Sequence, residues 1–152
     1  MKETARVQKL FHDLYNGQPW LDVTILNTLR PLSAAEAAKK VSPKWNSIWE
    51  IVNHLVEWRF GVLERVKGNT HPSPEDNYFR PIVDESAEAW QKTLARLDES
   101  QQAWNNFLGE FDEANFEKPY PPHNLTYYQH IHGILQHDAY HLGQIVLLAK
   151  PA

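Results

Sequence analysis

The stretch IHGILQHDAYHLGQIV, residues 131–146, decides the fold because its apolar residues recur every three or four positions. This spacing gives one buried helical face and predicts a helix over about residues 125–150. His137 and His141 lie at the margin of that face, four positions apart, so both imidazoles point into one patch of space. A helix that presents two imidazoles in this way can hold a metal ion with two nitrogens.

Apolar residues show the same helical spacing in several earlier stretches of the chain. No segment shows the sustained alternation that a half-buried strand needs. Capping-box spacing of Ser and Glu predicts two helix starts, and a plausible Asn cap precedes the last helix. The expected helical stripes are residues 7–14, 48–66 and 90–108, together with a helix that restarts at Pro19 and continues to Leu29. The expected caps are Ser33–Glu36, Ser47–Glu50 and Asn124.

Long amphipathic helices without strands predict an all-α fold, namely a four-helix bundle. The Pro-rich segment 69–84 joins the second and third main helices. It is too long for a tight antiparallel turn, and its length is typical of a crossover between parallel neighbours. We expect one domain over residues 1–152, because every helix needs the others to bury its apolar face.

Composition excludes several classes of protein. The formal net charge is −4 and no basic run occurs, so binding to nucleic acid is not expected. The chain contains no cysteine, which fits a reducing compartment and excludes disulfides, Cys-zinc sites and a thiol nucleophile from the protein. No apolar signal core or membrane span is visible. We therefore expect a cytoplasmic protein without membrane contact.

A third imidazole from a facing helix would turn the pair into a three-histidine site with one open coordination position. His54 is the candidate, because it also lies at the margin of the apolar face of its own helix. This pairing follows from the expected bundle and not from spacing. A bridging water or a carboxylate could satisfy two imidazoles equally well, and His130 could compete for the third position or line a pocket.

Trp58 and Gln144 follow the candidate ligands by one helical turn and are further candidates for the lining of a pocket. A core indole and a surface amide are equally compatible with their positions. No catalytic acid or base is assigned, because Asp138 points about 100° away from His137 on a helix. A zinc protease is excluded, since the general base is shortened to Asp138 and no third ligand follows His141.

The blocks SIWEIVNH (47–54) and QHDAYHLGQI (136–145) resemble the DinB-like superfamily of bundles, which includes the YfiT-like proteins. The resemblance covers essentially the whole chain, and its C-terminal block is the specific part. It implies that His54, His137 and His141 are the ligands of a divalent ion, commonly zinc or nickel. It also implies a homodimer, to which the six tryptophans of the chain add support because aromatic residues are enriched at interfaces.

The resemblance implies one fold and one set of metal ligands, but it implies several different reactions. Where an activity is known in such proteins, it is typically transfer of a low-molecular-weight thiol such as bacillithiol or mycothiol, or a related isomerisation. Many members carry only the description of metal-dependent hydrolase. We therefore expect a metal-dependent thiol S-transferase acting on a small molecule, with a metal-dependent hydrolase and a non-catalytic metal- or ligand-binding stress protein as alternatives.

Overall fold

A computed structural model describes residues 1–151 of the chain, and Ala152 of the expected domain lies outside the described residues. The described residues form α-helices, one short 3-10 helix and a single isolated bridge between Pro119 and Thr126. The all-α expectation is therefore confirmed. The elements are α1 (Glu3–Asn16), α2 (Ile25–Leu29), α3 (Ala34–Ala38), α4 (Ile48–Val66), α5 (Ala87–Glu110), η1 (Glu113–Asn115) and α6 (Tyr127–Leu148).

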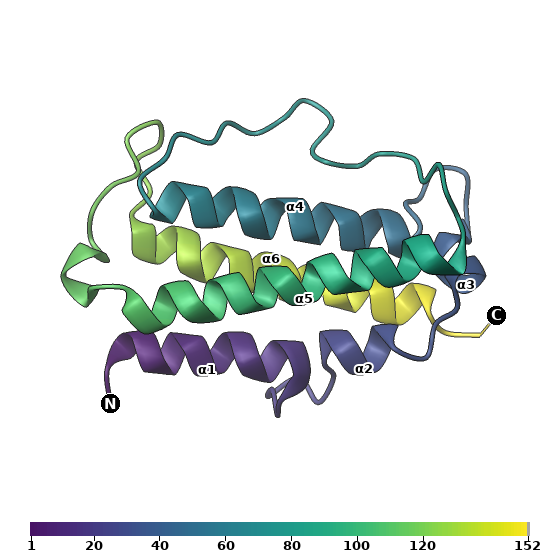
Figure 1. Ribbon diagram of the computed structural model, residues 1–152, viewed down its shortest axis with the longest axis horizontal. Helices are drawn as coiled ribbons and strands as arrows, with labels where there is room; N and C mark the ends of the chain where they lie inside the picture. The colour runs from purple at the N-terminus through teal and green to yellow at the C-terminus, as the bar shows by residue number, and fades with distance from the viewer. Residues whose placement is uncertain (152) are drawn as a thin grey trace.

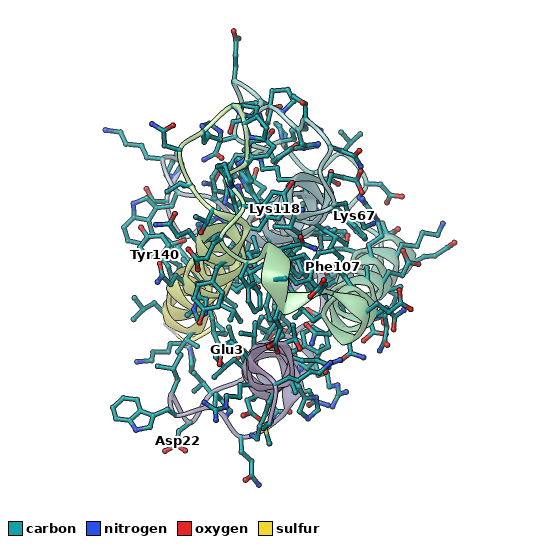
Figure 2. The ribbon with its side chains drawn as sticks, turned by 90° about the vertical axis from the view of Figure 1, so that its left-hand side faces the viewer. Glu3, Asp22, Lys67, Phe107, Lys118 and Tyr140 are labelled. Atoms are coloured by element: carbon teal, nitrogen blue, oxygen red, sulfur yellow. The ribbon has the colours of Figure 1, made fainter. Side chains whose placement is uncertain are left out.

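Four long helices, α1, α4, α5 and α6, pack into a bundle (Figure 1). Seen along its length, the bundle has α1 opposite α4 and α5 opposite α6 (Figure 2). The helices α4 and α5 run in the same direction, joined by the crossover loop, residues 67–86, which passes over the outside of α4 (Figure 1). The parallel crossover expected from the length of this connection is confirmed.

The capping residues explain where the helices begin. Ser33 with Glu36 and Ser47 with Glu50 form complete capping boxes at α3 and α4, as their spacing predicts. The cap expected at Asn124 is wrong. Thr126 caps α6 instead, because its side chain accepts from the backbone N–H of Gln129 and the Gln129 side chain accepts from the Thr126 N–H.

The helix expected from Pro19 to Leu29 is shorter than its apolar pattern suggests. Asp22 has a φ of 61°, a left-handed conformation that interrupts any helix. Thr24 then caps α2 by accepting from the backbone N–H of Asn27. Trp20 is consequently left 98% exposed rather than buried on a helix face. The turn chemistry at Asp22 and Thr24 therefore overrides the apolar spacing.

The core of the bundle consists of two apolar clusters, one toward each end. One cluster gathers buried residues of α4, α5 and α6 such as Leu55, Leu97 and Leu142 around the short helices. The other gathers aromatic and aliphatic residues, among them Phe11 and Trp104, whose rings stack. Within the part of the chain that the structure describes, no helix is both long enough and apolar enough to cross a membrane.

A buried ion pair crosses the bundle among α4, α5 and α6. Arg59 Nε donates to Asp138 Oδ2 at 2.9 Å, and their side chains are 1% and 0% exposed. The other guanidinium nitrogens donate to Ser100 Oγ at 3.0 Å and Gln101 Oε1 at 2.7 Å. Trp104 Nε1 donates to the backbone carbonyl of Arg59 at 2.9 Å. Because each guanidinium nitrogen donates to an acceptor on α5 or α6, Arg59 links three helices at one height of the bundle.

Replacing one partner of this pair leaves the other charge buried without a counter-charge. Asp138→Ala or Arg59→Ala should each lower the free energy of unfolding by about 3–5 kcal/mol. The double variant Arg59→Met/Asp138→Leu buries no charge and should lose less than either single variant. Urea unfolding followed by circular dichroism measures all three. Losses in the double variant equal to the sum of the single losses would contradict this account.

Candidate metal centre

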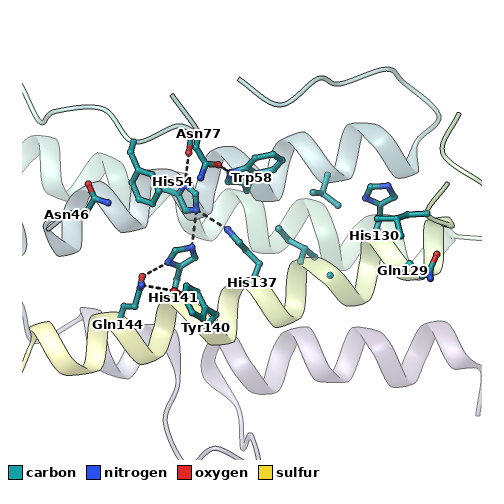
Figure 3. A pocket seen from close by; sticks show the side chains of 15 residues that line it. Asn46, His54, Trp58, Asn77, Gln129, His130, His137, Tyr140, His141 and Gln144 are labelled. Atoms are coloured by element: carbon teal, nitrogen blue, oxygen red, sulfur yellow. Dashed lines mark hydrogen bonds between the residues drawn. The ribbon is translucent and has the colours of Figure 1, made fainter. Parts of the chain in front are cut away.

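His54 of α4 faces His137 and His141 of the adjacent helix α6 (Figure 3). The Nε2 atom of His54 lies 2.9 Å from Nε2 of His137 and 3.0 Å from Nε2 of His141. His54 and His141 are 1% and 7% exposed, whereas the His137 side chain is 28% exposed. The structure therefore brings together all three histidines that the sequence singles out, with ligand atoms within 4.8 Å of one another.

Hydrogen bonds on the far side of two rings fix which nitrogen carries the proton. His54 Nδ1 donates to the backbone carbonyl oxygen of Asn77 at 2.6 Å. His141 Nδ1 donates to Oε1 of Gln144 at 2.6 Å, while Nε2 of that amide donates to the Tyr140 hydroxyl at 3.3 Å. A neutral imidazole with its proton on Nδ1 presents a lone pair at Nε2. Two of the three inward nitrogens are therefore acceptors.

The convergence of these lone pairs is the feature that fits a cation. Two bare nitrogens 3.0 Å apart repel one another unless a positive charge lies between them. Ligands at about 2.0–2.1 Å from a tetrahedral ion are about 3.3 Å apart, which is close to the 2.9 and 3.0 Å that separate Nε2 of His54 from the other two Nε2 atoms. The three histidines could therefore bind one metal ion.

The electrostatics keep two of the candidate ligands neutral at physiological pH. Burial lowers the pKa of His54 to about 4, against the opposing effect of its hydrogen bond to Asn77. Burial also lowers the pKa of His141, against the opposing effect of its hydrogen bond to Gln144. Only a neutral imidazole can ligate a metal, so these shifts leave the nitrogens ready for an ion.

The crossover loop supplies one wall of the site. The ring of Phe79 stacks on His54 with centroids 3.9 Å apart and planes inclined by 8°. Besides binding His54 through its carbonyl, Asn77 accepts the indole N–H of Trp58 through Oδ1 at 2.8 Å. Asn77 and Tyr78 have φ values of 51° and 60°, a left-handed conformation that asparagine tolerates well and tyrosine adopts at a cost. This strained turn fixes both His54 and Trp58.

A cavity of about 600 Å³ opens beside the three histidines (Figure 3). Its walls come from α4, the crossover loop and one stripe of α6 between Gln129 and Gln144. Trp58, His130 and Gln144, the candidates for pocket lining, all border this cavity. His130 lies at some distance from the three converging nitrogens and is not among the grouped ligands.

Comparison with protein families matches residues 23–145 to the DinB superfamily. The chain belongs to the DinB superfamily. The match spans α2 to α6 and so contains every residue of the candidate centre. Neither the curated proteins nor the solved structures give a match. Membership of the DinB superfamily therefore supports the helical bundle, and leaves the metal ligands and the reaction to be argued from the site itself.

Several residues at this DinB-type site have no signal in the sequence pattern. Asn77 and Phe79 belong to a loop without periodicity, so spacing cannot place them beside His54. Arg59 and Asp138 carry a clearer signal, because each occupies a position in an otherwise apolar helical stripe. Opposite charges at such positions on two helices indicate a buried pair. Asp138 is thus held by Arg59.

The two glycines near the site have different surroundings. A Cβ on Gly61 would lie 2.8 Å from Nε2 of His71, so this glycine makes room for the crossover loop rather than for a ligand. A Cβ on Gly133 would meet nothing within 4 Å, and Gly133 borders the cavity. Only Gly133 leaves space beside the candidate centre.

Burial lowers the pKa of His130 to about 4, from an ordinary value of 6.5. Between pH 6.5 and 4 the unfolded chain binds a proton at this position that the folded chain does not bind. The free energy of unfolding should therefore fall as the pH falls through this range, by about 1–3 kcal/mol from His130 alone. Replacing His130 with Gln should make the pH dependence shallower by that amount.

Urea unfolding of the metal-free protein at pH 7 and pH 4.5 measures the effect. The exposed His12 provides the matched control, because His12→Gln removes an imidazole that the fold does not bury. Equal pH dependence in wild type and His130→Gln would show that His130 is protonated in the folded chain.

Proposed function

We propose that this DinB-superfamily protein is a metal-dependent enzyme that transfers a low-molecular-weight thiol to a small electrophilic molecule. His54, His137 and His141 would hold one divalent ion. The observation that carries the proposal is the convergence of three Nε2 atoms on one point at the wall of a cavity of about 600 Å³. A structural metal site is closed by protein ligands, whereas three ligands beside a cavity leave a position for a substrate.

Imidazole nitrogen is a donor that suits zinc and nickel, the two ions expected from the family. An ion held by three neutral imidazoles supplies Lewis acidity, which favours the deprotonated form of a coordinated thiol or water. The chain has no cysteine, so the thiol would have to enter as a cosubstrate.

The protein's own side chains would contribute orientation and exclusion of water. Asn77 and Gln144 hold the inward nitrogens of His54 and His141 in the unprotonated form. Phe79 covers one face of His54, and Trp58 is held by Asn77 at the side of the cavity. These contacts would keep a bound thiolate in an environment of low polarity, where it is poorly hydrated and more nucleophilic.

The cavity wall favours thiol transfer over hydrolysis. Within residues 1–151, no Asp or Glu lines the cavity. Glu50 caps α4 and pairs with Lys40, while Glu57 pairs with Arg96. Hydrolysis by a metal centre commonly uses a carboxylate as general base, whereas attack by a thiolate needs no such group once the proton has left. Hydrolysis remains the second reaction to test.

The proposal includes a homodimer, which the family resemblance suggests. Trp20 and Trp45, at 98% and 58% exposure, support it because aromatic side chains are enriched at interfaces. The other tryptophans have places within the bundle; Trp49, Trp90 and Trp104 are buried.

Removing any one of the three candidate ligands should remove the ion. Wild-type protein should carry one equivalent of divalent metal by elemental analysis, and His54→Ala, His137→Ala and His141→Ala should each carry less than a tenth of that. His130→Ala is the matched control, because His130 lines the same cavity without joining the cluster. A full equivalent of metal in all three ligand variants would exclude the assignment of the ligands.

Chelation of the metal should leave the far-ultraviolet helicity intact, because the apolar clusters form the core without the ion.

Thiol transfer has a spectroscopic and a chemical signature. Cobalt-substituted protein should gain a sulfur-to-metal charge-transfer band when a low-molecular-weight thiol is added. With 1-chloro-2,4-dinitrobenzene as electrophile, a carbon–sulfur bond forms, the carbon–chlorine bond breaks, chloride leaves and the thiol proton passes to the buffer. His141→Ala should abolish both the band and the reaction, and His12→Ala, at an exposed position outside the cavity, should retain both.

A hydrolase would instead cleave esters or amides without added thiol, at a rate that rises through the pKa of the coordinated water. Absence of both reactions in fully loaded protein would favour the non-catalytic binding protein.

A further inference from the structure

The cavity beside the three histidines is polar in places but carries no formal charge of its own. Among the described residues that line it, none is Asp, Glu, Lys or Arg. Besides the imidazoles of four histidines, its polar groups are amides and a tyrosine hydroxyl, set between aromatic and aliphatic side chains. The amides belong to Asn46, Asn77, Gln129 and Gln144, and the hydroxyl to Tyr140.

Two buried arginines of α4, Arg59 and Arg65, are engaged in contacts of their own. Arg59 is paired with Asp138 inside the bundle. Arg65 stacks over Trp58 and Tyr120 and donates to the carbonyl of His71 and the hydroxyl of Ser73, so it anchors the crossover loop. Neither guanidinium borders the cavity.

Lys44 is the charged residue that lines the neighbouring, smaller cavity. It lines a separate cavity of about 360 Å³, which shares Asn46 and Gln144 with the larger one. The ammonium group therefore belongs to the smaller cavity and is not part of the wall around the candidate metal centre. His130 also adds no charge at neutral pH, because burial lowers its pKa to about 4.

This lining sets the cost of binding a charged ligand. An anionic group that leaves water for such a cavity loses its hydration, and it recovers that loss only by pairing with a cation. One anionic group can be met by a divalent ion at the histidines. A second anionic group on the same ligand would find amides and rings, which do not neutralise it.

We propose that the site takes an amphiphilic ligand with a single metal-binding head group and an otherwise uncharged body. This inference rests on the proposed function, because the head group binds the ion at His54, His137 and His141. The lining stripe of α6 from Gln129 to Gln144 is about 22 Å long. A body that lies along it contacts rings such as Trp58 and donates to or accepts from the neutral amides.

We call this preference for an uncharged body the charge rule. Two matched hydroxamates test it, because the hydroxamate head group binds divalent ions in general. Benzohydroxamic acid bearing a 4-carboxamide and its 4-carboxylate analogue have nearly the same shape and differ by one charge. We expect calorimetric titration of the metal-loaded protein to give at least tenfold weaker binding of the carboxylate. Equal binding of the two compounds would overturn the proposal.

Gly133 allows the charge of the cavity to be changed without a steric clash. A Cβ at this position meets nothing within 4 Å, and its backbone is helical, so a side chain can enter the cavity from α6. Gly133→Lys should reverse the preference in favour of the carboxylate. Gly133→Met, which fills similar space without charge, should retain the wild-type preference, and a reversal in that variant would overturn the charge rule.

The outcomes separate this proposal from the proposed function. If neither hydroxamate binds protein that carries a full equivalent of metal, the open coordination position is absent and both proposals fail. If both bind equally and Gly133→Lys changes nothing, the metal centre stands and only the charge rule fails. Preference for the carboxamide in wild type with reversal in Gly133→Lys supports the rule whichever reaction the centre performs.

Discussion

The buried ion pair between Arg59 and Asp138 sets the register between α4 and α6, and the candidate site depends on that register. Arg59 lies five positions after His54, and Asp138 lies between His137 and His141. A shift of α6 by one helical turn moves its residues by about 5.4 Å, which would break the pair and separate the Nε2 atoms. Apolar packing alone tolerates such shifts better, because it is not directional. The charged pair therefore specifies one alignment of the imidazoles.

The two apolar clusters let the bundle keep reactive groups at the edge of its core. They lie toward the two ends of the helices and bury large side chains such as Leu55 and Trp104. The cost of bringing three imidazoles close together is therefore met by packing elsewhere in the bundle. This explains how His137 can stay 28% exposed and face a cavity while its neighbour Asp138 is fully buried.

The sequence predicts those parts of the fold that repeat with the helical period. The stripes of α4, α5 and α6, the capping boxes and the parallel crossover all follow from spacing and length. The spacing of His137 and His141 likewise predicts their convergence, and the bundle places His54 opposite them. Local turn chemistry has no period, so the interruption at Asp22 escapes the pattern. The loop residue Asn77 escapes it for the same reason, although it holds His54 in place.

The parallel arrangement of α4 and α5 explains why a loop residue is available at the site at all. An antiparallel hairpin would join the two helices at one end and leave the outer face of α4 open to solvent. A parallel pair forces the chain to travel back along the whole helix, and the crossover loop does so along the outside of α4 (Figure 1). Phe79 of this loop stacks on His54. The connection that the topology requires therefore also becomes a wall of the cavity. Its left-handed turn at Asn77 and Tyr78 is the strained point at which the loop contacts the candidate centre.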